Sequence, residues 1–210
     1  MASTSEQPPH EERFKAVMGG FVNVLHGFFQ NLHSRKITKI QPNTILLAQG
    51  FVEGYNSVSV LENYINYSQE YWPKIAAKDE SFMIENCHQI FRDLPSSNPD
   101  ELIETFKTLY TSRIFIDNGE EIVINVDDPR YSQGHDVLTS NEKEALWSFF
   151  MAMTKISIKY IHDKREPFVK SKEVDGKMTE VLRYKCKAFP EVKKLQNTAK
   201  MFNLTLEWRS

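Results

Sequence analysis

The chain has 210 residues, of which 40% are hydrophobic and 12% aromatic, and its formal net charge at pH 7 is -2. This composition supports a hydrophobic core in one domain, or in one domain with an appendage, and excludes a largely disordered chain. No apolar run approaches the roughly 18 residues of a membrane-spanning helix. The polar N-terminal leader, residues 1–12, lacks the apolar segment of a secretory signal peptide.

The two cysteines, Cys87 and Cys186, bear on the cellular compartment. They are too few for a disulfide framework or for a zinc site built from cysteines. We therefore expect reduced thiols in an intracellular protein.

Charge is divided unevenly along the chain. Residues 1–154 contain 12 Lys and Arg against 21 Asp and Glu, whereas residues 155–210 contain 14 against 7. The net charge is therefore -9 in the first part and +7 in the second. An acidic body followed by a basic end predicts a molecule that meets an anionic partner, or a second copy of itself, with that end.

Much of the chain is predicted to be helical, because apolar residues recur at three- and four-residue steps. The first helix is expected over residues 11–33, where Gly19-Gly20 marks a close helix crossing, a bend or a weak point. Ser57 is the expected N-cap of a third helix, and Trp72-Pro73 is expected to break it. Helices are also expected over residues 42–53, 81–94, 99–110 and 140–162.

The period of the apolar residues changes after residue 112. Two runs rich in β-branched residues, Arg113–Asp117 and Glu120–Val126, flank Asn118-Gly119. This arrangement is the strongest short-range signal for a β-hairpin with a type I′ turn. We expect the hairpin to be followed by a polar loop over residues 127–136.

The last long helix begins with Thr139 and Glu142 at the spacing of a capping box. Within it, Trp147 is placed at the margin of the apolar face, so we expect a partly buried or interfacial side chain with a bonded indole N–H. Residues 174–177 are expected either to turn a second hairpin or to lie in a loop before another helix. A short final helix is expected after Pro190.

Two clusters offer catalytic or metal-binding residue types. The loop 127–136 contains three aspartates and one histidine, but their spacing matches no ligand frame, so we interpret it as a solvated connection. Cys87 and His88 are neighbours on a helix, where side chains point about 100° apart, so they do not face each other. The chain contains no Gly-rich phosphate loop and no GxSxG motif. The sequence therefore predicts no catalytic residue, no metal site and no bound cofactor.

The basic end is the main candidate for binding a partner. Aromatic residues such as Tyr184 and Phe189 lie among its cations, which suits nucleic acid. A plain solvated surface, anionic lipid and a protein partner are the alternatives. A protein partner or self-association is preferred to nucleic acid, because the acidic part of the chain is the complement of the basic part. The expected partner-binding residues are Lys164, Arg165, Lys170, Lys172, Arg183, Lys185, Lys187, Lys193 and Lys194.

Two segments resemble a pattern in small helical proteins of nucleocytoplasmic large DNA viruses, and together they cover about a fifth of the chain. The pattern consists of Phe14, Phe21-Val22, Leu25, Phe28-Phe29 and Leu32, followed later by residues 144–150. The resemblance implies a helical, viral and non-enzymatic protein, located in the host cytoplasm or in the virion.

The predicted fold is mainly α, a helical bundle-like domain with one inserted β-hairpin near residues 113–126 and a basic C-terminal region. The expected parts are a flexible leader over residues 1–12, the helical domain over 13–166 and the basic region over 167–210. The predicted function is a non-enzymatic structural or interaction protein. One alternative is a nucleic-acid-associated protein, which a continuous basic face would favour. The other is an enzyme with a site built from scattered residues, which a cavity with converging polar groups would favour.

Overall fold

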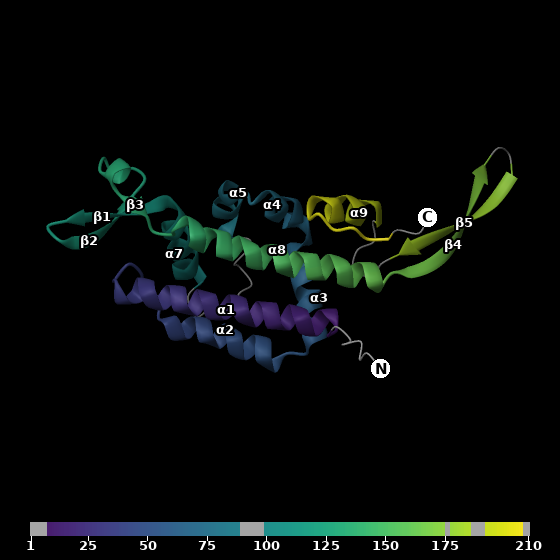
Figure 1. Cartoon of the computed structure of the whole chain (residues 1–210), viewed down its shortest axis with the longest axis horizontal. Coiled ribbons are helices and arrows are strands. Elements are labelled where there is room, and N and C mark those ends of the chain that lie inside the picture. Colours follow the sequence, from purple (N-terminus) through teal and green to yellow (C-terminus); the bar gives the residue numbers. More distant parts are fainter. Residues whose placement is uncertain (1–7, 89–98, 175–176, 186–191, 208–210) are drawn as a thin grey trace, which may run out of the picture.

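Two long helices form the centre of the molecule. The computed structural model describes residues 8–88, 99–174, 177–185 and 192–207. Helix α1 (His10–Ser34) and helix α8 (Ser140–Asp163) lie side by side along the length of the molecule (Figure 1). This arrangement confirms the prediction of a mainly α protein.

Shorter helices cover the two long ones on both sides. Helices α2 (Pro42–Gly54) and α3 (Ser57–Ser68) pack against α1, and α4 (Trp72–Ala77) and α9 (Val192–Met201) pack against α8. Helices α5 (Glu80–Glu85) and α7 (Pro99–Thr111) follow towards the end of the molecule that carries the first hairpin (Figure 1).

The predicted hairpin is confirmed. Strand β1 (Ser112–Asp117) pairs antiparallel with β2 (Glu120–Asn125), and the turn residues Asn118 and Gly119 have φ angles of 50° and 84°. Both are positive, as a type I′ turn requires. A two-residue strand, β3 (His135–Asp136), adds to the free edge of β1. The sequence did not predict β3, because two residues are too few to show an alternating pattern.

A second hairpin resolves the alternative left open for residues 174–177. Strand β4 (Glu166–Val174) pairs antiparallel with β5 (Lys177–Lys185). The two strands extend beyond the end of α8, away from the helices and opposite the end that carries β1 and β2 (Figure 1). We call β4 and β5 together the basic ribbon.

Helix α9 belongs to the helical body. Leu195 and Ala199 of α9, and Phe202 directly after it, are buried in one core cluster with Phe14 of α1 and Trp72 of α4. The described residues after 166 therefore include both the ribbon and a helix that packs on the helical body. At the other end of the chain, α1 begins at His10 and so includes the last residues of the expected leader, whose residues 1–7 lie outside the described part.

Helix ends follow the expected chemistry with two corrections. The capping box is present, because Thr139 accepts a hydrogen bond from the Glu142 backbone and Glu142 accepts one from the Thr139 backbone. The N-cap of α3 is Asn56 rather than Ser57, since the Asn56 carboxamide oxygen accepts from the backbone of Val58. Trp72-Pro73 begins α4 rather than only ending the preceding helix, which suits proline in a first turn.

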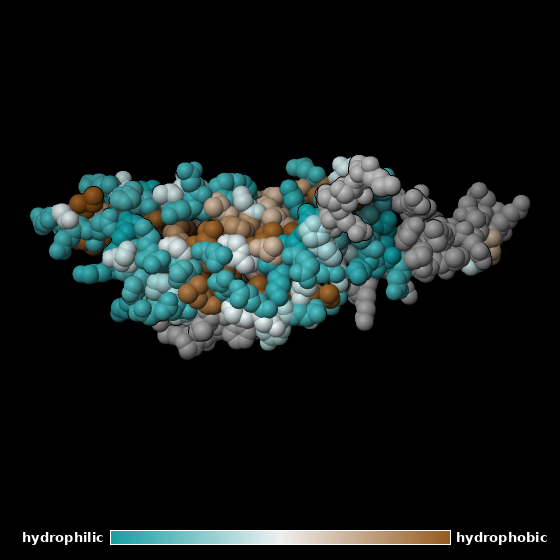
Figure 2. Space-filling view, turned by 60° about the horizontal axis from the view of Figure 1, so that its bottom comes forward, coloured by the Kyte–Doolittle hydropathy of each residue, from teal (hydrophilic) through white to brown (hydrophobic). Residues whose placement is uncertain are grey.

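The glycine pair in α1 marks a helix crossing. A Cβ atom on Gly20 would lie 3.3 Å from the ring of Phe149 on α8. The ring of Phe21 also packs against α8, with its centroid 5.6 Å from that of Phe149 and 5.2 Å from that of Phe150. Apolar residues also gather over the middle of the helical body on the face shown in Figure 2.

The expectation for Trp147 is wrong. Its side chain is only 4% exposed, and its Nε1 has no hydrogen-bond partner among the described residues. The sequence placed it at the margin of the apolar face of α8. Lys78 and Glu80, at the junction of α4 and α5, line the same cavity as Trp147, so a segment distant in the chain lies near this part of α8. Such proximity has no signal in the periodicity of α8 alone.

The type I′ turn generates a stability prediction. Gly119→Val should lower the free energy of unfolding by about 1–2 kcal/mol, because a β-branched residue is strained at positive φ. Chemical denaturation followed by far-UV circular dichroism measures the change. Glu120→Val, at an exposed strand position next to the turn, should cost less than about 0.5 kcal/mol. An equal cost for both variants would contradict the assignment of the turn.

Candidate functional site

The basic ribbon starts where α8 ends, at a cluster of polar side chains. His162 and Asp163 close the helix, and the ribbon begins three residues later at Glu166. Asp163 lies between two histidines: its Oδ2 is 2.7 Å from Nε2 of His10, and its Oδ1 is 2.8 Å from Nδ1 of His162. The cluster thereby ties the start of α1 to the end of α8.

The same cluster holds the C-terminal segment. His162 Nε2 lies 2.9 Å from the carbonyl oxygen of Glu207, and Arg165 Nη2 donates to the same oxygen at 3.1 Å. A carbonyl and a carboxylate both accept hydrogen bonds, so each ring nitrogen of His162 faces an acceptor. The root of the ribbon is therefore fixed by α1, α8 and the C-terminal segment together.

The pKa of Asp163 reflects this arrangement. Partial burial raises the pKa, but the hydrogen bonds from His162 and His10 outweigh it, so the pKa of Asp163 lies below its usual value. The carboxylate is thus held in its charged form, facing the two histidines.

The first two predicted partner-binding residues differ in role. Lys164 is the C-cap of α8, with an exposed side chain whose Nζ lies 5.6 Å from the ring centroid of Tyr160. Arg165 bonds to the carbonyl oxygens of His162 and Glu207. Arg165 is therefore an anchor of the ribbon's root, and its guanidinium already has acceptors within the protein.

The register of the ribbon sorts its charged residues between two faces. Directly paired residues share a face, and successive residues along a strand alternate between faces. Five pairs make one face, and each contains one Lys or Arg. They are, from the root outwards, Glu166–Lys185, Phe168–Arg183, Lys170–Val181, Lys172–Thr179 and Val174–Lys177. We call this set the basic face.

The opposite face of the ribbon has the reverse composition. Its four pairs are Pro167–Tyr184, Val169–Leu182, Ser171–Glu180 and Glu173–Met178. They contain two glutamates and no Lys or Arg, whereas the basic face contains five cations and one glutamate. The structure thus brings Lys170, Lys172, Arg183 and Lys185 together and adds Lys177, which the sequence did not single out as a site residue. The strand register is the signal that identifies it.

The remaining predicted residues lie elsewhere. Lys193 and Lys194 are in the first turn of α9, and the side chain of Lys194 is exposed. Lys187 lies outside the described residues. The described partner-binding residues that the sequence predicts are therefore divided between the basic face, the root of the ribbon and α9.

Seven cations among the described residues of the acidic body are paired with its carboxylates. Lys74 contacts Asp79 at 2.8 Å, and Lys78 contacts Glu144 at 2.6 Å. Hydrogen bonds from Arg35 and Arg130 lower the pKa values of Glu121 and Asp128. Further pairs are Lys107–Glu104, Arg113–Asp136 and Lys143–Glu80. These cations add little free positive charge to the body.

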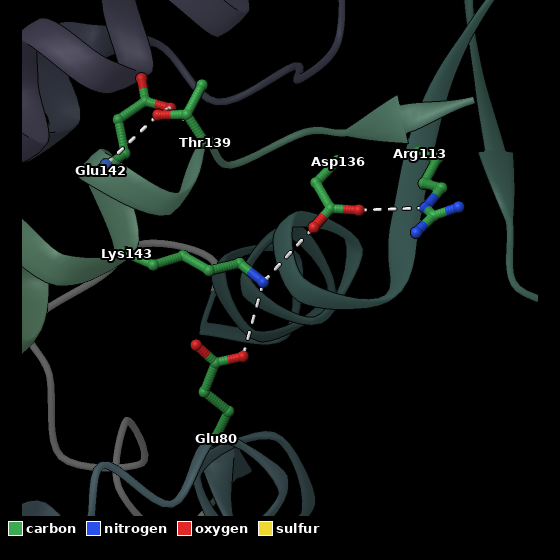
Figure 3. A network of polar contacts seen from close by, with 6 residues as sticks. All are labelled: Glu80, Arg113, Asp136, Thr139, Glu142 and Lys143. Atoms are coloured by element: carbon green, nitrogen blue, oxygen red, sulfur yellow. Dashed lines mark hydrogen bonds and ion pairs between the residues drawn. The ribbon is translucent and has the colours of Figure 1, made fainter.

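A second polar cluster joins the hairpin to α8 and α5 (Figure 3). Lys143 lies between Asp136 of β3 and Glu80 of α5, at 3.7 Å and 3.4 Å, and Asp136 also accepts from Arg113 of β1 at 3.0 Å. The polar loop 127–136 is exposed or half-buried throughout, and it contributes the exposed Asp136 to an ion-pair network.

An open cavity of about 320 Å³ lies beside this network. It is lined by Lys78, Glu80, Ser140, Lys143, Glu144 and Trp147. Its lysines are engaged by its glutamates, Lys78 with Glu144 and Lys143 with Glu80. Such mutually paired charges are typical of a structural junction between helices, and we assign no chemistry to them.

The described residues contain neither a candidate metal site nor a candidate membrane-spanning helix. Within residues 8–88, 99–174, 177–185 and 192–207, no group of three or more His, Cys, Asp and Glu is placed to hold a metal ion. In that same part of the chain, no helix combines the length and the apolar character needed to cross a bilayer.

Comparison with known proteins adds no relative. No family model, no curated protein and no solved structure matches the chain. The resemblance to proteins of large DNA viruses therefore stays a prediction.

The Asp163 cluster generates a prediction about pH. A carboxyl whose pKa is lower in the folded than in the unfolded state stabilises the fold above its unfolded pKa, and this stabilisation is lost as the pH falls through the folded value. Asp163→Asn should therefore lower the free energy of unfolding at pH 6, and the difference from wild type should shrink as the pH falls below about 4. Denaturant unfolding at pH 6 and at pH 3 measures both effects.

Asp127→Asn is the matched control, because Asp127 is an exposed aspartate in the loop after β2. It should change stability little at either pH. A difference between Asp163→Asn and wild type that is as large at pH 3 as at pH 6 would contradict the assigned role of the Asp163 charge.

Proposed function

We propose that this protein is a non-enzymatic interaction protein, in which an acidic helical body presents a basic ribbon that binds an anionic partner. The register of β4 and β5 carries this proposal, because it gathers all five Lys and Arg residues of the two strands on one face. A face with one dominant sign of charge attracts partners of the opposite sign over a distance of about one Debye length.

The shape of the ribbon supports the same function. It extends away from the helices (Figure 1), and its root is held by the contacts of His162, Asp163 and Arg165. A two-stranded hairpin by itself is only marginally stable in water. A bound partner would supply a further packing surface and stabilise the ribbon.

A second copy of the chain is one candidate for the anionic partner. Its acidic part, residues 1–154, has a net charge of -9 and could receive the ribbon of a neighbouring copy. Contacts of this kind join unlike surfaces, so they would produce closed rings or open chains rather than simple two-fold dimers.

Matched charge reversals test the proposed function. Lys170→Glu with Lys172→Glu changes the basic face, and Lys36→Glu with Lys39→Glu makes the same change in net charge at exposed positions after α1, at the opposite end of the molecule. The probe is retention on heparin, a linear polyanion, with oligomeric mass measured by light scattering. We expect the ribbon variant to elute from heparin at clearly lower salt than the control variant.

Equal elution of the two variants would show that retention follows net charge alone and would overturn the proposal. Far-UV circular dichroism of both variants establishes that the helical body is intact. The ribbon is a small part of the chain and is not helical, so this measurement reports on the helical body and not on the ribbon.

A further inference from the structure

We infer that the basic face binds double-stranded nucleic acid through the phosphate backbone, without reading the base sequence. This inference rests on the proposed function and names its partner. It starts from the order of the cations along the ribbon. Each of the five pairs on the basic face supplies one, from β5 at the first two pairs, from β4 at the next two and from β5 at the last.

The cations therefore form a single row. Consecutive pairs on one face of a ribbon lie two residues apart, which is about 6.7 Å at a rise of about 3.3–3.4 Å per residue. Five such positions span about 27 Å. A duplex presents both phosphate strands over that length, with about 3.4 Å of helix axis per base pair, so the row matches roughly eight base pairs.

A row of charge suits a linear polyanion better than it suits a folded protein. The carboxylates of the helical body are distributed over several helices and the first hairpin, and Asp79, Glu80 and Glu144 are already paired with lysines of the body. Docking the ribbon on such a surface would compete with these pairs. Phosphates hold only mobile counterions, whose release favours binding.

The dimensions of the ribbon also fit a duplex. The major groove of B-form DNA is about 12 Å wide and admits a two-stranded β-ribbon. Four of the five cations of the basic face are lysines, which bind phosphate as point charges. Contacts to phosphate position a protein on the duplex but carry no sequence information. We therefore expect similar affinity for duplexes of unrelated sequence.

The dependence of affinity on salt tests this inference. The full chain is titrated into a fluorescent 24-base-pair DNA duplex, at several salt concentrations between 50 mM and 200 mM, with binding followed by fluorescence anisotropy. Each neutralised phosphate contributes about -0.9 to the slope of log affinity against log salt. Five contacts predict a slope of about -4.5, which is a loss of roughly 500-fold over this range.

Neutral substitutions on the two faces provide the matched comparison. Lys170→Gln with Lys172→Gln should reduce the magnitude of the slope by about two, because two phosphate contacts are removed. Glu173→Gln with Glu180→Gln changes two charges on the opposite face and should leave the slope within about half a unit of wild type. A second duplex of unrelated sequence should bind within about threefold of the first.

The alternatives give different results. If the duplex does not bind at 50 mM salt while light scattering shows an assembly that the Lys170→Glu and Lys172→Glu variant dissociates, the partner is a second copy. That result overturns this inference and leaves the proposed function standing. A monomer that binds neither the duplex nor heparin overturns both. Equal slopes for the two Gln variants would also overturn the inference, because the basic face would then make no phosphate contacts.

Discussion

The packing of α1 against α8 is the constraint on which the rest of the structure depends. The two helices come close where Gly20 faces the ring of Phe149, and Phe21 packs beside that contact against Phe149 and Phe150. A side chain at position 20 would push against an aromatic ring in a close-packed core, which resists even small changes of volume. With the two helices aligned in this way, the first hairpin lies at one end of the molecule and the basic ribbon at the other (Figure 1).

The two ends of α8 are stabilised by different polar interactions. At its start, the capping box of Thr139 and Glu142 satisfies backbone groups of the first turn, and Lys143 one residue further connects Asp136 with Glu80 (Figure 3). At its end, Asp163 bridges His10 and His162. The first set holds the hairpin sheet against the body, and the second set holds the root of the ribbon. Helix α8 therefore acts as a rigid connection between two regions rich in charge.

The charge split of the sequence becomes a spatial separation in the fold. Cations of the body pair locally with its carboxylates, as Lys74 does with Asp79 and Lys78 with Glu144. Ion pairs of this kind at a surface contribute little stability, about 0–1 kcal/mol each, but they offset the charge of the cations that take part. On the ribbon, the alternation of a β-strand moves Glu173 and Glu180 to one face and leaves the cations on the other. The ribbon thus gathers its own five cations on one face.

Local patterns in the sequence by themselves determined the helical class, the α1 and α8 segments, the capping box at Thr139 and the type I′ hairpin at Asn118-Gly119, because each depends on residues only a few positions apart. Tertiary structure alone decided the burial of Trp147, the return of α9 to the core and the addition of β3 to the sheet, since each is a contact between distant segments. The same holds for the candidate site. The sequence showed which residues of the C-terminal region are basic, but a shift of one residue in strand pairing would change which residues face each other across the ribbon. Only the observed register, with Lys170 opposite Val181, places one cation in each pair of a single face.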